Sequence, residues 1–228
     1  MLENLTKVFS VALLLFASSV NANYIYEANQ SLFDLTNQTG TTNMASGDDQ
    51  VSGAFNLDFT FTFYGEDFTS ARMATNGCLH FKTTGSYCND YTPDPLPEIT
   101  YTLYPFWTDL IRDNGSKVLA KNFTDKTVFG WYDLREYNRS GSDNSFEVIL
   151  WNSNDTFEFR YGGLDIINHD VLIGEQGTSS ELYTYYYHDE CSTGTTNVAG
   201  TCVNTNWNST SFNTLLENGG SLYGLGSG

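Results

Sequence analysis

Phe59-Thr60-Phe61-Thr62-Phe63-Tyr64-Gly65 decides the fold class of this chain. Aromatic and small polar residues alternate along it. Because successive side chains of a strand point to opposite faces, the stretch predicts a strand with one fully apolar face. Ala74-Thr75-Asn76-Gly77 follows between two further alternating runs. Asn-Gly is the preferred pair for a hairpin turn in which both turn residues have positive φ, so we expect a hairpin there.

Similar alternation recurs further along the chain, and apolar residues nowhere recur at helical spacing over a long window. Two later runs put their apolar residues on one face each: Phe146, Val148 and Leu150 in the first, and Phe157, Phe159 and Tyr161 in the second. Glu158 and Arg160 alternate with the second set, where a solvated charge pair is expected. Short strands separated by turns predict an all-β chain, an antiparallel β-sandwich with long loops.

The first 22 residues are typical of a secretory signal peptide. Lys7 precedes an apolar run, and Val20-Asn21-Ala22 offers small residues for cleavage before Asn23. A short membrane anchor is the alternative. We expect a secreted protein, extracellular or at the cell surface, with no membrane span after cleavage. The predicted parts are the signal peptide (1–22), a polar N-terminal arm (23–54), the sandwich (55–190), and a disulfide loop with a glycine-rich, flexible tail (191–228).

The net charge is −17. Such a surface repels nucleic acid and anionic membranes, so we expect no nucleic-acid partner. Cations and basic partners are favoured, although charge alone selects no function.

Four cysteines remain after cleavage, namely Cys78, Cys88, Cys191 and Cys202. Export permits disulfides, and of the three possible connectivities we favour Cys78 with Cys88 and Cys191 with Cys202, because each pair closes a short polar loop. Seven Asn-x-Ser/Thr sequons are glycosylation candidates for a glycoprotein: Asn29, Asn37, Asn114, Asn122, Asn138, Asn154 and Asn208.

Several segments, in this order, resemble the nidogen-like (NIDO) extracellular domain family. Phe61-Thr62-Phe63-Tyr64-Gly65 is similar to its FxFYG strand, Thr75-Asn76-Gly77 to its hairpin, and Pro105-Phe106-Trp107 with Asp109 to its PFW-x-D segment. Ser145 to Leu150 is similar to its FQ-x-x-L strand, with Glu147 in place of the commoner Gln. The resemblance implies matrix association, cell adhesion or structural assembly. The family has no established catalytic residues, so none is expected.

Three groups of residues are candidates for chemistry. Oxygens near one turn make Asp109, Asp113 and Asn114 weak calcium candidates, and Asp48 with Asp49 forms a second acidic pair. Tyr183, Tyr185 and Tyr187 share one predicted strand face, either as an exposed aromatic binding patch or as core. Glu147 and Glu158 lie on successive strands, in the manner of a glycosidase carboxylate pair.

The sequence therefore favours a secreted adhesion protein of the extracellular matrix that binds a surface protein or glycan without catalysis. It is not expected to be an enzyme, and no cofactor is expected apart from possible calcium. Two alternatives remain open. One is a structural subunit that self-assembles into an extracellular filament by strand exchange. The other is a glycan-active hydrolase that uses Glu147 and Glu158.

Overall fold

The computed structural model describes residues 25–28, 30–82, 84–85, 88, 92–166, 168–188, 190–192, 195–198, 201–203 and 220–225. Side chains are described for residues 30–82, 84–85, 88, 92–166 and 168–184. The predicted signal peptide and the sequons at Asn29 and Asn208 lie outside the described residues. The side chains of Cys191 and Cys202 are likewise not described.

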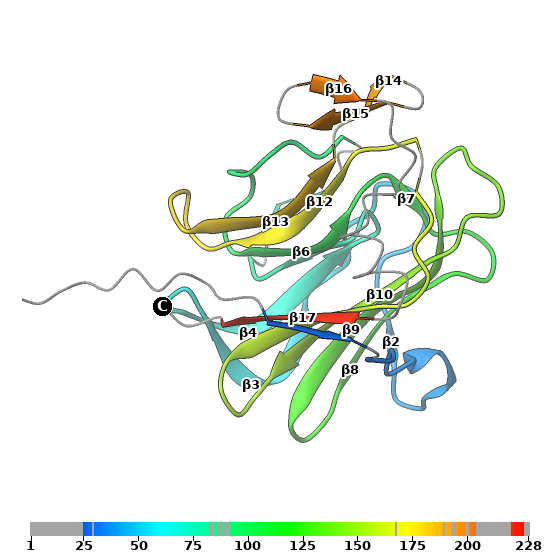
Figure 1. The fold of residues 1–228 in the computed structure, drawn as a ribbon. Coiled ribbons are helices and arrows are strands. Elements are labelled where there is room, and N and C mark those ends of the chain that lie inside the picture. The colour runs from blue at the N-terminus through cyan, green and yellow to red at the C-terminus, as the bar shows by residue number, and fades with distance from the viewer. Residues whose placement is uncertain are drawn as a thin grey trace, which may run out of the picture.

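The described chain is built almost entirely from strands, and two antiparallel sheets face each other (Figure 1). This confirms the predicted all-β fold class. A single short 3₁₀ helix is present in the described part, η1 (Leu35–Asn37).

The larger sheet has eight strands. In spatial order they are β1 (Ile25–Ala28), β17 (Gly220–Leu225), β11 (Thr156–Tyr161), β10 (Asn144–Trp151), β9 (Lys126–Glu136), β8 (Lys117–Asn122) and β2 (Thr42–Asn43), with β7 (Leu110–Ile111) paired to β9. All of its pairings are antiparallel. The strand β17 lies in the segment that its glycine content predicts to be flexible.

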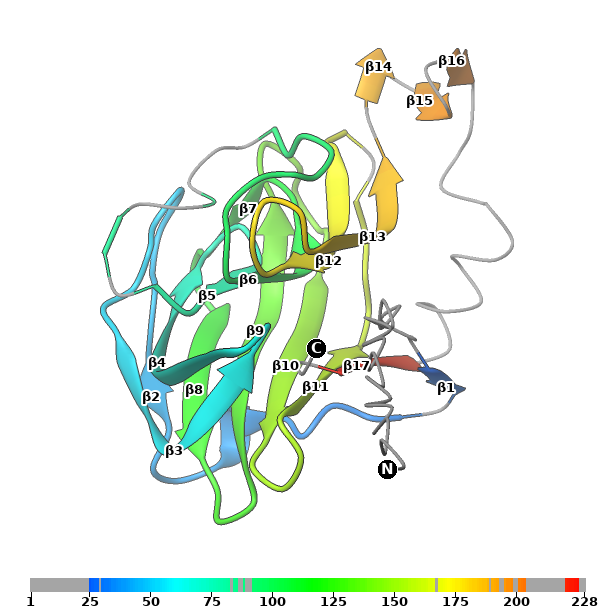
Figure 2. The same cartoon turned by 90° about the vertical axis from the view of Figure 1, so that its left-hand side faces the viewer.

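The second sheet has six strands, in the order β13 (Leu182–His188), β12 (Val171–Gln176), β6 (Thr102–Trp107), β5 (Cys78–His80), β4 (Glu66–Ala74) and β3 (Phe55–Phe63). A small third sheet, β14 (Glu190–Ser192), β15 (Thr195–Val198) and β16 (Thr201–Val203), projects beyond the sandwich (Figure 2).

The core between the two large sheets consists of the apolar residues that alternation predicts. Phe61 and Phe63 are fully buried, while Phe59 is half-buried beside a register shift between β3 and β4. The predicted apolar faces of β10 and β11 are likewise fully buried in this core. Trp131 of β9 stacks on Phe146 with ring centroids 4.9 Å apart, and its Nε1 donates a hydrogen bond to the carbonyl of Ala74 in the opposite sheet. Burying each such aromatic side chain stabilises the fold by roughly 1.5–3 kcal/mol.

The predicted hairpin joins β4 to β5, but its turn differs from the expected one. Three residues, Thr75 to Gly77, connect the strands, and only Gly77 has a positive φ, of 84°. The prediction that Asn76 also needs a positive φ was wrong. Its side chain is fully buried instead, where Nδ2 donates to Asp49 and Oδ1 accepts from the backbone of Leu110. The turn therefore fastens two distant loops to the sheet.

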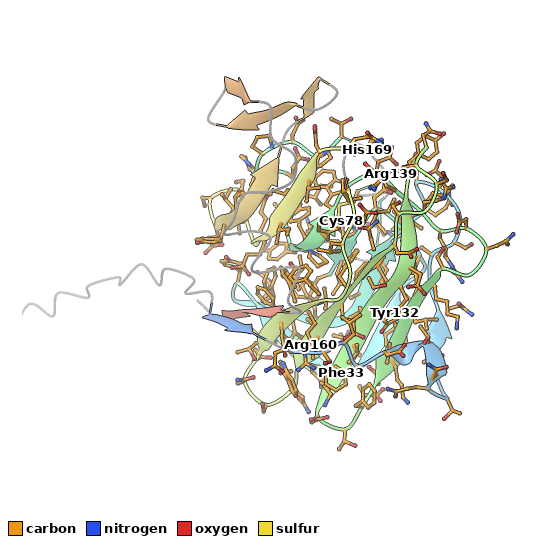
Figure 3. The ribbon with its side chains drawn as sticks, turned by 45° about the vertical axis from the view of Figure 1, so that its right-hand side comes forward. Phe33, Cys78, Tyr132, Arg139, Arg160 and His169 are labelled. Carbon is orange, nitrogen blue, oxygen red and sulfur yellow. A yellow bond between two sulfur atoms is a disulfide. The ribbon has the colours of Figure 1, made fainter. Side chains whose placement is uncertain are left out.

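The outer face of the larger sheet is covered by residues 30–38, which we call the docked arm. Glu147 of β10 is fully buried there and accepts hydrogen bonds from the backbone amides of Phe33 and Asp34 and from the hydroxyl of Tyr132. The Tyr132 hydroxyl in turn accepts the amide of Leu35 at 3.0 Å. Figure 3 shows Phe33, Tyr132 and Arg160 together on this side of the molecule. The arm thus gives this face a second apolar layer.

The outer face of the six-stranded sheet is covered by the loop after β5. The predicted disulfide between Cys78 and Cys88 is formed, and Cys88 packs with Tyr104 and Trp107 beneath the loop. The Tyr104 hydroxyl donates to the carbonyl of Ile99 and accepts its amide, which ties the far end of the loop to β6. Each sheet is therefore buried on both faces over part of its area.

Candidate functional site

An acidic pocket of about 570 Å³ opens in the described part of the chain. Its lining includes Asp48, Asp49, Asp109, Asn138 and His169. These residues come from four separate stretches: the loop before β3, the segment between β6 and β7, the loop between β9 and β10, and the loop before β12. The pocket is a product of tertiary structure rather than of one motif.

Hydrogen bonds to the hairpin turn bring the loop before β3 to Asp109. The backbone of Gln50 pairs with Thr75, and Asn76 Nδ2 donates to Asp49 Oδ1 at 2.8 Å. The same Asn76 side chain accepts the amide of Leu110 at 3.1 Å, immediately after Asp109. One buried amide side chain therefore links the loops that carry Asp49 and Asp109, two of the four aspartates that line the pocket.

Asp48, Asp49 and Asp109 converge on one point. Each offers a carboxylate oxygen, and these oxygens lie within 4.8 Å of one another. Asp109 is 4% exposed, and among the described residues its carboxylate has one ionic neighbour and receives no hydrogen bond. Asp48 Oδ1 is also buried without a hydrogen-bond partner among them. Three converging carboxylates with His169 as one ionic neighbour leave an excess of negative charge, which favours a cation in the pocket.

The pKa values of two of these carboxyl groups are raised. Burial raises the pKa of Asp109 to about 6, with His169 opposing the shift and the charges of Asp48, Asp49 and Glu136 adding to it. Burial, and next the charge of Asp49, also raises the pKa of Asp48.

One wall of the pocket is a chain of ionic contacts. His169 Nε2 lies 3.4 Å from Asp109 Oδ2, and His169 Nδ1 lies 2.9 Å from Oε1 of the fully buried Glu136. Arg139 then bridges Glu136 at 3.1 Å and Asp165 at 2.7 Å. Figure 3 shows His169 and Arg139 close together at this end of the molecule. These contacts hold the loop before β12 against the end of β9, so this side of the pocket is fixed by ion pairs.

Replacing Asp109 by Asn is expected to change how stability depends on pH. The raised pKa means that the folded state binds a proton more tightly than the unfolded state between about pH 4 and 6. Stability conferred by this group is therefore present below pH 4 and lost as the pH rises through about 6. We therefore compare the free energy of unfolding of the variant and the wild type by urea denaturation in EDTA. Between pH 4 and 7 the difference should shift by about 1–2 kcal/mol in favour of the variant. Parallel curves for the two proteins would contradict the expectation.

The donor set suits calcium. Calcium takes six to eight oxygens at 2.3–2.6 Å, so two oxygens on one ion are at most about 5 Å apart, which the three aspartates satisfy. The predicted grouping of Asp109 with Asp113 and Asn114 is replaced by this one. Asp113 is bonded to Arg135 and Ser116, and Asn114 is exposed in the following turn. Proximity in sequence was a poor guide to proximity in space.

Glu147 and Glu158, the predicted hydrolase pair, are both fully buried under the docked arm. Oxygens of Glu158 accept from Arg160 at 2.6 Å and from Trp151 Nε1 at 3.2 Å. The expectation of a solvated pair of Glu158 with Arg160 was wrong, because the arm covers them. Both carboxylates have structural partners and neither lines the acidic pocket.

Tyr183 of the edge strand β13 is 39% exposed, as a binding-patch residue would be. The side chains of Tyr185 and Tyr187 lie outside the described residues. Of the sequons, Asn37, Asn114, Asn138 and Asn154 are exposed. Asn122 is half-buried and donates to the carbonyl of Asn56. Asn138 lies at the acidic pocket.

Sequence reasoning missed the role of Glu136 and His169 and the joining of the two acidic groups. No local pattern signals either, since the contacts join residues more than 25 positions apart.

Comparison with known proteins gives one match. A family model described as NIDO related matches residues 23–214. No curated protein and no solved structure is detectably similar to the chain. No helix with the length and apolarity of a membrane span occurs in the part of the chain that the structure describes.

Proposed function

Because the chain belongs to the NIDO-related family, we propose that it is an extracellular binding domain that associates with a surface or matrix partner without catalysis. Domains of this family are typically extracellular. The signal-peptide pattern and the disulfide between Cys78 and Cys88 support export.

The binding site in this proposal is the acidic pocket, occupied by calcium. One observation carries it: the carboxylate of Asp109 is buried, faces the pocket and receives no hydrogen bond from the described residues. A calcium ion supplies the missing positive charge. Three aspartates leave several of its six to eight positions open, and oxygens of a partner glycan or protein can fill them. The pocket, far larger than one ion, leaves space for such a group.

Calorimetric titration with calcium chloride tests the site. The wild type is expected to bind one ion with a dissociation constant of about 10⁻⁴–10⁻³ M, the range of extracellular modules, and Asp109→Asn should weaken binding at least tenfold. Asp58→Asn is the matched control, because it removes the same charge from an exposed strand position outside the pocket. Absence of binding, or equal loss in both variants, would refute the site.

The association itself is tested by capture of surface-exposed proteins and glycans on immobilised domain, with calcium or with EDTA. Capture that requires calcium and fails with Asp109→Asn supports the proposal. Calcium binding together with capture that EDTA leaves intact would show that the ion is structural. Catalytic turnover of a captured glycan would contradict the absence of catalysis.

A further inference from the structure

The C-terminal strand β17 has an unusual place in the larger sheet. It lies between β11 and β1, with Phe159 registered opposite Leu222 and Tyr26 opposite the same residue on the other side. Figures 1 and 2 show β17 and β1 side by side at this edge. Four residue pairs join β17 to β1 and five join it to β11. Among the described strands, β1 pairs with no other. β17 therefore connects the outermost strand, β1, to the rest of the larger sheet.

A long connection joins this strand to β16 of the small third sheet. Residues 204–219 separate β16 from β17, which is sixteen positions, and β17 lies beyond the residues that match the family model. Sixteen residues span at most about 55 Å, whereas a domain of this size is about 40 Å across. The connection is long enough for β17 to reach the same edge of a neighbouring molecule.

The composition of β17 suits pairing with more than one molecule. Gly220 to Leu225 contains no charged residue and no proline, the residues that proteins use to keep edge strands from pairing with other chains. Main-chain hydrogen bonds supply most of the affinity in such strand addition. On the acceptor side, five residues of β11 pair with β17, so without a strand in this place the main-chain groups on that side of β11 would be unpaired.

We infer that β17 of one chain occupies the position between β11 and β1 of a second copy, so that the protein self-associates by strand exchange. All nine residue pairs are kept when two copies exchange strands, so the exchange costs mainly the entropy of association. Within one chain the strand has an effective concentration of about millimolar, and exchange competes with it where the protein is concentrated. Reciprocal exchange gives a closed dimer, and head-to-tail exchange gives a filament.

Two single-cysteine variants of the full chain test this directly. Thr156 is registered opposite Leu225, and residues so paired have Cα atoms about 4.5–5.5 Å apart, within the range of a disulfide. Thr156→Cys and ¹⁵N-labelled Leu225→Cys are mixed at about 1 mM, oxidised slowly and weighed by intact-mass spectrometry. A half-labelled covalent heterodimer is expected, at least tenfold above a control mixture of Thr60→Cys with Leu225→Cys. Thr60 is exposed on the other sheet and reports random collision.

The double variant Thr156→Cys/Leu225→Cys completes the experiment. A disulfide within one chain at low concentration and between chains at high concentration supports exchange. A disulfide only within one chain, with no heterodimer above the collision control in the mixture, would overturn the inference. So would failure of the double variant to form any new disulfide, because the register would then be wrong. Electron microscopy of the exchanged wild type distinguishes the dimer from the filament.

Discussion

Gly77→Ala is expected to yield almost no folded protein. A Cβ atom at this position would lie 2.1 Å from the backbone oxygen of Phe106 and 3.1 Å from the ring of Phe146. Since the nearest obstacle is the main chain of β6, near its C-terminal end, relief requires moving a core strand. The positive φ of this residue adds backbone strain. We expect the free energy of unfolding to fall by more than about 4 kcal/mol, which is a large part of the stability of a typical domain.

Gly65→Ala is the matched control for this experiment. Gly65 also has a positive φ, of 75°, but a Cβ there meets nothing within 4 Å. Gly65→Ala should therefore lower the free energy of unfolding by only about 1–2 kcal/mol, from backbone strain alone. The yield of folded protein and the midpoint of urea denaturation, measured for both variants, give the comparison. Equal stability would show that the close approach of Gly77 to Phe106 does not constrain the fold.

Glu147→Ala is expected to release the docked arm from the larger sheet. The change removes the acceptor of three hydrogen bonds, from Phe33, Asp34 and Tyr132, at a fully buried position. Leaving buried donors unpaired costs about 1–3 kcal/mol each when they stay buried, and we expect a total of about 3–5 kcal/mol. For a domain of this size the melting temperature should fall by about 10 °C.

Hydrogen exchange measured by mass spectrometry localises this effect. Peptides covering residues 30–38 should lose protection in Glu147→Ala while those of the core strands keep theirs. Glu175→Ala is the control, since Glu175 is equally buried but lies on β12 of the six-stranded sheet and accepts from Tyr64 rather than from the arm. Unchanged protection of the arm in Glu147→Ala would contradict the assigned role.

The core strands could be predicted from the sequence because alternation is a local property. Phe146, Val148 and Leu150 are buried simply because they occupy one side of a pleated strand that faces the other sheet. The local disulfide followed from short loop length for the same reason. For the core strands and this disulfide, the residues adjacent in the sequence contain all the information that the prediction needs.

The coverings and the acidic pocket could not be predicted in this way. Burial of Glu147 depends on residues more than 110 positions away, and no alternation in β10 indicates that an arm covers its polar face. Asp109 meets Asp49 because the buried side chain of Asn76 lies between their two loops. The sequence marks Asn76 only as a turn residue. These contacts depend on hydrogen bonds between residues far apart in the sequence, and such bonds produce no periodic pattern that a sequence analysis could detect.

The adjacency of β1 and β17 determines how the domain would respond to tension. The two strands are antiparallel, and Ile25 is paired with Tyr223, so the start of β1 and the end of β17 lie at the same end of this ribbon. Tension applied between the ends would load the cross-strand bonds one after another, as in a zipper, instead of all together. The ribbon would then part at a lower force than it would if all of its cross-strand bonds were loaded together.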